Sequence, residues 1–198
     1  MIGAIVLAAG RSERMGRPKP LLPCRGTTFL GAVLDTLGRT RAGAIRVVLG
    51  RGAEAIRKAA GLPDDLVVVN PTPERGMLSS LHLGIAALPP GVRAFLVWPV
   101  DHPLVEAETV DRLIAALEAS GAPLAVPVHA GRRGHPALLS MGIAPEIETA
   151  PETEGARAVV RAHASDLVEV AVDDAGVVTG IDTPEAYAAA FGHPPGGE

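Results

Sequence analysis

Short apolar runs alternate along this chain with longer segments in which apolar residues recur every three or four positions. Residues 4–8 form the first such run, and residues 27–38 carry the first helical pattern, with its large apolar side chains on one face. Alternation of this kind is typical of strands joined by crossover helices, which build a largely parallel sheet. The pattern therefore predicts an α/β protein: a single-domain, Rossmann-like, three-layer α/β/α fold with a mostly parallel mixed sheet.

The same pattern predicts the individual elements. Strands are expected at 4–8, 45–49, 66–69, 94–98, 124–128, 167–172 and 177–181, and helices at 27–38, 53–60, 78–88, 106–119, 155–163 and from Pro184. Residues 145–154, rich in proline, glutamate and threonine, are expected to form a surface segment. Residues 1–191 are predicted to form one domain and residues 192–198, rich in glycine and proline, a flexible tail.

Composition narrows the class of protein. The 198 residues are 47% hydrophobic, 20% charged and only 3% aromatic, with a net charge of −4. This is typical of a globular protein, and it offers no basic, aromatic surface for nucleic acid. Cys24 is the only cysteine, which excludes an intrachain disulfide and a multi-cysteine zinc site. Because no apolar run approaches the length of a membrane span, the protein is expected to be cytoplasmic and to have no membrane partner.

The loop after the first strand is the first candidate for ligand binding, because ligands of open parallel sheets bind at the carboxyl ends of strands. Small residues let a ligand approach the backbone, whose N–H groups can form an anion-binding concavity. The residues concerned are Leu7, Ala8, Ala9, Gly10, Arg11, Ser12, Arg14, Arg17 and Lys19. Their spacing fits neither a P-loop nor a dinucleotide fingerprint, so the alternative is an ordinary strand-to-helix turn with a basic rim.

The string LAAGRSERMGRPK at 7–19 resembles the signature of nucleotidyltransferases with the nucleotide-diphospho-sugar transferase fold, and among them the small MobA-like molybdenum-cofactor nucleotidyltransferases. The resemblance implies that the backbone of residues 7–12 meets the base and phosphates of a nucleotide. It also implies that Arg14 and Lys19 neutralise the reacting phosphates.

An acidic residue, Asp101, follows the predicted strand 94–98 at the same edge of the sheet. It could bind Mg2+, which proteins usually hold with one or two carboxylates, or could cap the following turn. The string DHP at 101–103 resembles an Asp-x-Pro motif of the same family, in which the Asp binds magnesium. His102 departs from the family's usual methionine, and beside a carboxylate it leaves a Zn2+ or Mn2+ site as an alternative.

A second carboxylate, Asp182, precedes the last predicted helix. Asp182 or Thr183 is placed to cap that helix, whose first turn contains Pro184. The string IDTPEAY at 181–187 resembles a late family motif whose Asp or Asn completes the metal site. Capping by Thr183 would leave Asp182 available to bind metal with Asp101.

Base recognition is expected from residues 70–84, which open with a turn and run into a helix. Ser79 and Ser80 offer small hydroxyls that can read the edge of a pyrimidine; alternatively, both serve only the helical turn. The string from Gly76 to Gly84 resembles the cytidylyltransferase form of this region, which favours CTP over GTP.

Residues 131–136 follow the predicted strand 124–128, where a second substrate could approach the nucleotide. Two arginines between glycines either bind a phosphate or form the exposed tip of a hairpin. The string GRRGHP resembles the acceptor-side motif of molybdenum cofactor cytidylyltransferases, which implies that Arg132, Arg133, Gly134 and His135 contact the acceptor. For His135 the alternative is that it only holds the loop.

Together these motifs predict a Mg2+-dependent enzyme that transfers CMP from CTP to the phosphate of molybdenum-molybdopterin and releases pyrophosphate, with Arg14, Lys19 and Asp101 as catalytic residues. A molybdoenzyme or its maturation chaperone is an expected partner. Two alternatives stay open. One is a cytidylyl- or uridylyltransferase acting on a sugar or polyol phosphate, and the other is a non-catalytic carrier of the finished cofactor, which would need neither Asp101 nor Lys19.

Overall fold

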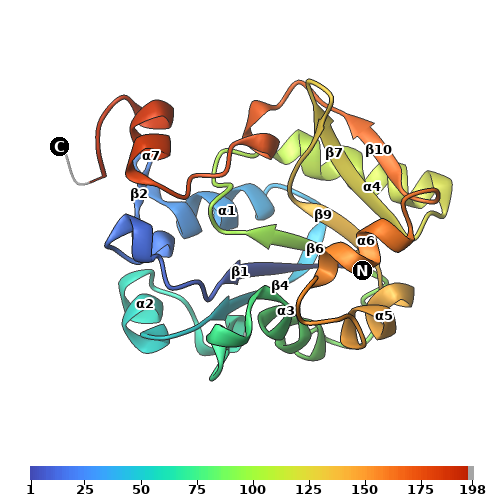
Figure 1. The fold of residues 1–198 in the computed structure, drawn as a ribbon, viewed down its shortest axis with the longest axis horizontal. Coiled ribbons are helices and arrows are strands. Elements are labelled where there is room, and N and C mark those ends of the chain that lie inside the picture. The colour runs from blue at the N-terminus through green and yellow to red at the C-terminus, as the bar shows by residue number, and fades with distance from the viewer. Residues whose placement is uncertain (196–198) are drawn as a thin grey trace.

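The computed structural model describes residues 1–195 and shows a mixed sheet with helices on both faces (Figure 1). The strands lie in the order β10-β7-β9-β6-β1-β4-β5, β8 pairs with β7, and β2 and β3 form a separate hairpin. Their bounds are β1 Ile2–Ala8, β2 Pro23–Cys24, β3 Thr27–Thr28, β4 Ala42–Leu49, β5 Val67–Val69, β6 Ala94–Pro99, β7 Leu124–His129, β8 Arg132–Arg133, β9 Ala137–Ser140 and β10 Val168–Ala171.

Helices connect these strands. The α-helices of the described chain are α1 Phe29–Leu37, α2 Ala53–Ala59, α3 Met77–Ala86, α4 Ala107–Ser120, α5 Ala144–Glu148, α6 Ala156–Ala162 and α7 Pro184–Phe191. Short 3-10 turns lie at Glu13–Met15, Lys19–Leu21, Asp64–Leu66, Pro73–Arg75, Met141–Ile143 and Ala175–Val178. The first helix has the features that its sequence predicts. Thr28 Oγ1 caps α1 by accepting from Gly31 N at 3.0 Å, and the apolar residues Phe29, Leu30 and Val33 are buried.

β1 is buried on both faces, as expected of a central strand in a parallel sheet. On one side Ala4 and Val6 belong to the apolar core that includes residues of α1, α4 and α7. On the other side Ile5 and Leu7 belong to the core formed with α3, α5 and α6. This arrangement of helices, sheet and helices confirms the predicted three-layer α/β/α fold.

The sheet is mostly parallel. β1 pairs in parallel with β4 and β6, β4 with β5, and β7 with β10, whereas β9 and β8 run antiparallel to their neighbours. The sequence did not reveal β9, because its four residues follow a glycine-arginine loop without an intervening helix. Inserted between β6 and β7, this strand makes the sheet mixed, in agreement with the predicted fold class.

The strand predicted at 177–181 is absent; the segment contains the 3-10 turn Ala175–Val178 and irregular chain. The buried carboxylate of Asp174 causes this difference, because it accepts from Gly176 N at 2.9 Å, from Glu106 N at 2.8 Å and from Thr109 Oγ1 at 2.8 Å. Because these hydrogen bonds hold the chain in a turn, the segment cannot form the regular hydrogen bonds of a β-strand with a neighbouring strand. Its backbone groups are bonded singly to other loops, including Ile181 N to Asp101 O at 2.8 Å.

Two other expectations concern the carboxyl-terminal third. The surface segment predicted at 145–154 includes most of α5, which is held in place by the fully buried side chain of Ile147. The predicted tail 192–198 lies partly outside the described residues, which end at Pro195. Within that described part, none of the helices has the length and apolar character needed to cross a bilayer.

The strand order brings three loops to one edge of the sheet. β6 points to the left in Figure 1, and the parallel β1 ends beside it. Val100 N, just after β6, donates to Leu7 O at 3.1 Å, so the chain segments that leave the two strands stay in contact. The segment that follows Ile181 reaches the same place through its bond to Asp101.

Candidate active site

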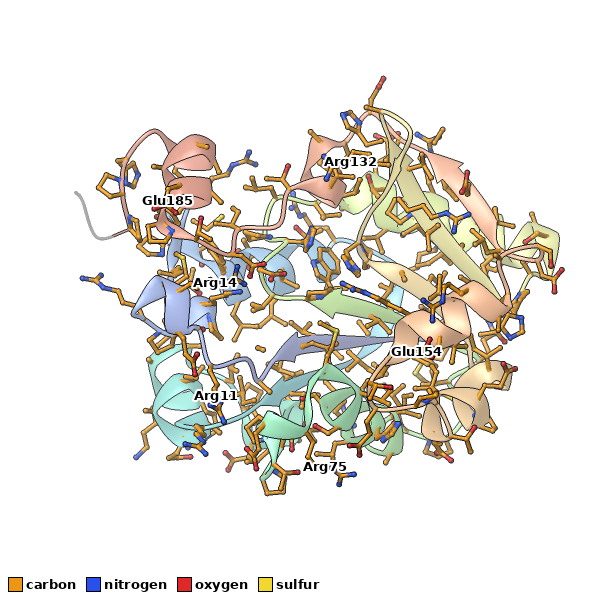
Figure 2. All side chains as sticks on the ribbon, viewed as in Figure 1. Arg11, Arg14, Arg75, Arg132, Glu154 and Glu185 are labelled. Atoms are coloured by element: carbon orange, nitrogen blue, oxygen red, sulfur yellow. The ribbon has the colours of Figure 1, made fainter. Side chains whose placement is uncertain are left out.

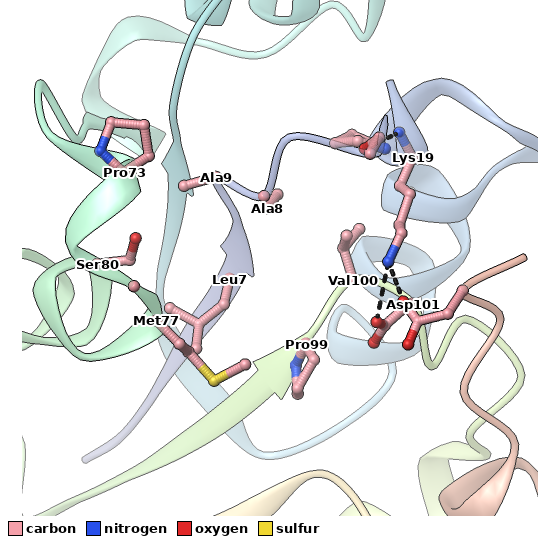
Figure 3. Close-up of a pocket in the computed structure, with 15 residues that line it drawn as sticks. Leu7, Ala8, Ala9, Lys19, Pro73, Met77, Ser80, Pro99, Val100 and Asp101 are labelled. Carbon is pink, nitrogen blue, oxygen red and sulfur yellow. Dashed lines mark hydrogen bonds and ion pairs between the residues drawn. The ribbon is translucent and has the colours of Figure 1, made fainter. Parts of the chain in front are cut away.

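A cavity of about 360 Å³ opens at this edge of the sheet (Figure 3). Its wall combines the loop after β1, the start of α3 and the loop after β6. The lining residues are Leu7, Ala8, Ala9, Gly10, Ser12, Lys19, Pro20, Pro73, Gly76, Met77, Ser80, Pro99, Val100, Asp101 and Asp182. Figure 3 shows two ends: Pro73, Met77 and Ser80 on one side, and Lys19 with Asp101 on the other.

The loop after β1 forms one wall with little side-chain bulk. A Cβ added to Gly10 would meet no atom within 4 Å, so the backbone there is open to a ligand. Ser12 adopts a left-handed conformation with φ 53°, and its Oγ accepts from Lys19 N at 3.0 Å. Ser12 therefore closes the loop on itself and fixes where the Lys19 side chain starts.

Asp101 and Asp182, the two predicted metal ligands, both form ion pairs with Lys19, the predicted catalytic lysine. Lys19 Nζ lies 3.4 Å from Asp101 Oδ2 and also donates to Asp182 Oδ1. Arg14 Nη2 lies 3.6 Å from Asp182 Oδ2, and the Arg14 side chain is 68% exposed. The structure thus brings these four residues together, with the charges of two cations and two carboxylates in balance.

The two carboxyl groups differ in their environment. Burial raises the pKa of Asp101, and the neighbouring Asp182 raises it further, although Lys19 and His102 act in the opposite direction. Burial would also raise the pKa of Asp182, but its interactions with Lys19 and Asp101 and the charge of Arg14 lower it overall. Asp182 is thus the more readily ionised member of the pair.

Thr183, rather than Asp182, is the residue that caps α7. The Thr183 Oγ1 accepts from Ala186 N at 3.2 Å, and Pro184 lies in the first turn. Because Thr183 takes this role, Asp182 keeps both carboxylate oxygens for Lys19 and Arg14.

The carboxylate pair is compatible with a divalent cation. Asp101 Oδ1 is buried and has no hydrogen-bond partner among residues 1–195, although a carboxylate oxygen usually has one. Mg2+ is typically held by one or two carboxylates together with waters and phosphate oxygens. Among the described residues no group of three or more His, Cys, Asp or Glu side chains is placed to hold a metal ion. Within the cavity, Asp101 and Asp182 are the carboxylates that could contribute to such a site.

His102 lies next to Asp101 and is held by several contacts. Its Nε2 is 3.9 Å from Asp101 Oδ1, its Nδ1 is 3.4 Å from Gly176 O, and its carbonyl accepts from Trp98 Nε1 at 3.0 Å. The His135 ring stands edge-on to it, with 4.9 Å between ring centroids. Burial lowers the pKa of His135 to about 4, and the charges of His102 and Arg157 contribute.

Of the predicted acceptor residues, His135 is the one that packs against the Asp101 region. Gly134 is required by close packing, since a Cβ there would lie 2.3 Å from Val177 O. Arg132 and Arg133 are exposed in β8, and Arg133 Nε donates to Glu169 at 2.6 Å. Figure 2 shows Arg132 in the upper part of the molecule, apart from Arg14, and Arg132 is not among the residues that line the cavity.

Residues predicted to read the base are also separated. Ser80 lines the cavity, whereas Ser79 lines a smaller neighbouring one and donates to Gly76 O at 2.8 Å. Gly76 is the N-cap residue of α3; it lines the cavity and has a φ of 93°. Gly84 instead allows α3 to pack closely against the sheet, because a Cβ there would lie 2.4 Å from Ile5 Cγ2 of β1.

Arg11 of the predicted nucleotide loop points away from Arg14. It lies beside α2 in Figure 2, pairs with Glu13 at 3.4 Å and lines a separate cavity of about 430 Å³ on the outer side of the loop. The backbone of Gly10 and Ser12 borders both cavities.

Several wall residues were not identified from the sequence. Pro20, Pro73, Met77, Pro99 and Val100 line the cavity, and Asn70 lies directly behind Ser80. Met77 is a large apolar side chain that is 58% exposed where it lines the cavity. Exposure is not visible in a sequence, so this signal appears only in the folded chain.

Comparison with known proteins identifies the family. The family described as "MobA-like NTP transferase domain" matches residues 4–170. Among curated proteins, the chain is 33% identical to nicotine blue oxidoreductase of Paenarthrobacter nicotinovorans over 81% of each chain. It is 33% identical to 2-C-methyl-D-erythritol 4-phosphate cytidylyltransferase of Streptomyces avermitilis, over 88% of this chain and 78% of that protein. It is 32% identical to molybdenum cofactor guanylyltransferase of Cupriavidus pinatubonensis over 92% of each.

A solved structure supports the same assignment. Rv0371c of Mycobacterium tuberculosis superposes with a TM-score of 0.86 at 33% identity, covering 97% of this chain and 98% of that one. The same protein in complex with manganese gives a TM-score of 0.79 at 29% identity, with 96% and 98% covered. The chain therefore belongs to the MobA-like NTP transferase family and is an enzyme of the nucleotidyltransferase class.

Proposed function

We propose that this nucleotidyltransferase transfers CMP from CTP to the phosphate of molybdenum-molybdopterin and releases pyrophosphate. The observation that carries the proposal is the meeting of Lys19, Asp101 and Asp182 at one end of a cavity whose other end is lined by Ser80. A nucleotide laid along this cavity has its base beside Ser80 and its phosphates at the charged end. Ala8 and Ala9 of the loop after β1 lie between the two (Figure 3).

The chemistry needs no general base. The phosphate of the acceptor is mostly ionised at pH 7, since the second pKa of a phosphate monoester is about 6. One of its oxygens forms a bond to the α-phosphorus of CTP, the bond from that phosphorus to the bridging oxygen breaks, and the electron pair leaves with pyrophosphate. The phosphate of the acceptor is itself the nucleophile, so the reaction needs no nucleophilic side chain from the protein.

The chain's own residues contribute position and charge. Lys19 and Arg14 stabilise the negative charge that develops on the phosphates. Asp101 and Asp182 would hold Mg2+, which offsets phosphate charge when bound. The manganese complex of a similar protein supports a divalent ion in this family, and magnesium is our proposal for this member.

CTP as the nucleotide rests on Ser80 and on the string from Gly76 to Gly84. A single small hydroxyl on the wall suits a pyrimidine edge. The similar proteins differ in the base that their names give, since one is named a cytidylyltransferase and another a guanylyltransferase. The proposal therefore has to be tested against all four nucleotides.

His135 is our candidate contact for the acceptor, because it packs against His102 beside Asp101. We propose that Arg132, Arg133 and Gly134 form the outer part of the same acceptor site. A molybdoenzyme or its maturation chaperone would receive the product. The proposal carries a cytoplasmic location with it, because CTP is available there.

Pyrophosphate release tests the proposal directly. It should be measured from CTP, GTP, ATP and UTP with Mg2+, with and without a molybdopterin-type acceptor, for the wild type and Asp101→Asn. The matched control is Asp111→Asn, an exposed aspartate on α4 that pairs with Arg41. We expect CTP-selective release that requires the acceptor, survives in D111N and disappears in D101N.

Two other results would replace the proposal. Release that occurs only with a sugar or polyol phosphate would keep the reaction and change the acceptor, an outcome that the similarity to a methylerythritol phosphate cytidylyltransferase makes worth including. Acceptor binding without release from any nucleotide would indicate a non-catalytic carrier.

A further inference from the structure

Asn70 is a buried amide directly behind the nucleotide cavity. It follows β5, is 2% exposed, and its backbone N–H donates to Leu49 O at 2.7 Å. Its side chain makes three hydrogen bonds, one to the segment that leads into α3 and two to serines in the first turn of α3. None of these bonds involves the Lys19 end of the cavity, so Asn70 has no part in the phosphate chemistry proposed above.

The hydrogen bonds of Asn70 fix the orientation of its amide. Thr72 N can only donate, so the side-chain atom 2.9 Å from it is the oxygen, Oδ1. The amide nitrogen therefore faces α3, where its two protons are donated to Ser79 Oγ and Ser80 Oγ, each at 2.9 Å. Both serine oxygens consequently accept from Asn70.

A hydroxyl that accepts in this way keeps its own proton to donate elsewhere. The Ser79 proton has a protein acceptor, Gly76 O at 2.8 Å. The Ser80 hydroxyl donates no hydrogen bond within residues 1–195, and Ser80 lines the cavity on the wall that also carries Pro73 and Met77 (Figure 3). The proton of Ser80 is thus left for a group that enters the cavity.

We propose that Asn70 is a positioning residue for base selection: by donating to Ser80 Oγ, it directs the Ser80 proton into the cavity and selects a base with an acceptor atom at that point. Among pyrimidines this favours cytosine, whose N3 carries a lone pair where uracil carries an N–H. The inference rests on the proposed CTP substrate and adds the group that sets the direction of the hydrogen bond.

The substitution Asn70→Asp reverses that direction with little change in shape. An aspartate at this position still accepts from Thr72 N but can no longer donate to the serines. The Ser80 hydroxyl then donates to the carboxylate and presents only lone pairs to the cavity, which suits the N–H of uracil. A mismatched buried hydrogen bond typically changes affinity by about tenfold.

The test measures the dissociation constants of CTP and UTP without acceptor for four proteins: the wild type, N70D, Ser80→Ala and the double variant. The pH should be 8, so that the new carboxyl group is ionised. We expect the preference for CTP over UTP to fall at least about tenfold in N70D and to be largely lost in S80A. The double variant should resemble S80A, because Asn70 acts through the Ser80 hydroxyl.

Ser79→Ala is the matched control. Ser79 accepts the other amide proton of Asn70 but does not line the nucleotide cavity, so its loss should leave the ratio of CTP to UTP affinity unchanged. Circular dichroism and thermal unfolding establish that each variant is folded. If N70D does not fold, Asn70→Ala replaces it in the comparison with S80A and the double variant. We then expect the preference for CTP over UTP to be lost, because no group at position 70 sets the direction of the Ser80 hydrogen bond.

Two outcomes would overturn the inference: an unchanged CTP to UTP ratio in folded N70D, or effects of N70D and S80A that add independently in the double variant. A wild type that prefers GTP overturns the CTP assignment instead. The cycle is then measured with GTP, and its non-additivity still decides whether Asn70 acts through Ser80.

Discussion

Lys19 and Asp101 are 82 residues apart in the chain, yet Lys19 Nζ lies 3.4 Å from Asp101 Oδ2. The two meet because β1 and β6 are neighbouring parallel strands, so that the loops after them leave the sheet at one edge. Asp182 reaches the same ammonium group from a third segment. One lysine thus pairs with two carboxylates in a site that is proposed to receive both phosphates and a metal ion, and Arg14 supplies the second positive charge.

Removal of this lysine should slow catalysis more than it weakens binding. In Lys19→Met the site loses the cation that stabilises the transferring phosphates, and we expect kcat to fall by at least about 100-fold with a smaller change in KM. Steady-state kinetics with CTP and acceptor measures both constants. The control is Lys58→Met, which alters the chain's other lysine, exposed on α2 and paired with Glu54. An unchanged kcat in K19M would remove Lys19 from the catalytic residues.

The same contact predicts the metal affinity of the protein without nucleotide. In the wild type Lys19 forms ion pairs with both Asp101 and Asp182, so a divalent ion competes with it for these oxygens. We expect K19M to bind Mn2+ more tightly than the wild type does when no nucleotide is present, and Asp182→Asn to bind it more weakly. Electron paramagnetic resonance of free Mn2+ measures this directly. Equal affinity in K19M and the wild type would show that Lys19 does not compete with the ion.

The parts of the site predicted from the sequence are those fixed by the order of the strands. The small residues after β1 and the aspartate after β6 follow apolar runs, and parallel strands bring such loops to one edge. The ion pair between Lys19 and Asp182 could not be predicted in this way, because Asp182 does not follow a strand of the sheet. Asp182 reaches the site through the bond from Ile181 N to Asp101 O, a contact between loops that no periodic pattern encodes.

Other differences come from side chains whose direction depends on exact placement. Ser79 and Ser80 differ by one position, and about 100° of rotation along a helix decides which of them faces the cavity. The start of α3 at Met77 fixes that rotation, and the sequence placed it one residue later. The strand predicted at 177–181 is lost because the buried carboxylate of Asp174 forms a turn, and a preference of the valines for β-structure cannot outweigh three hydrogen bonds.

Two glycines that the sequence analysis assigned to nucleotide binding, Gly84 and Gly10, should respond in opposite ways to substitution by alanine. A Cβ on Gly84 would lie 2.4 Å from Ile5 Cγ2 in the core between α3 and β1, so Gly84→Ala should lower the free energy of unfolding by about 1–3 kcal/mol. A Cβ on Gly10 meets nothing within 4 Å, so Gly10→Ala should keep the stability of the wild type. It should instead weaken nucleotide binding, because Gly10 lines the cavity and an added methyl group would take up space there.

Denaturant unfolding and nucleotide titration separate these two effects. The expected pattern is low stability with near-normal affinity per folded molecule in G84A, and normal stability with reduced affinity in G10A. Unchanged nucleotide affinity in G10A would show that the ligand does not approach this backbone.

His135 should make the stability of the protein depend on pH between about 6.5 and 4. Burial holds its pKa at about 4 in the folded protein, while an unfolded histidine titrates near 6.5. Between these values the unfolded chain binds the proton and the folded chain does not, so folding loses stability as the pH falls from about 6.5 towards 4. The full difference corresponds to about 3 kcal/mol. Above pH 7 both states are neutral at this residue and stability is independent of it.

Urea unfolding at intervals from pH 7.5 to 4.5 measures this dependence, and His135→Gln isolates it from the titration of the carboxyl groups. We expect the slope of unfolding free energy against pH to be shallower in H135Q than in the wild type across this window. The exposed His193 provides the control, since His193→Gln should leave the slope as it is. Parallel curves for the wild type and H135Q would mean that His135 accepts its proton as readily in the folded protein as in the unfolded one. The His135 side chain beside His102 would then be less buried in solution than in the structure.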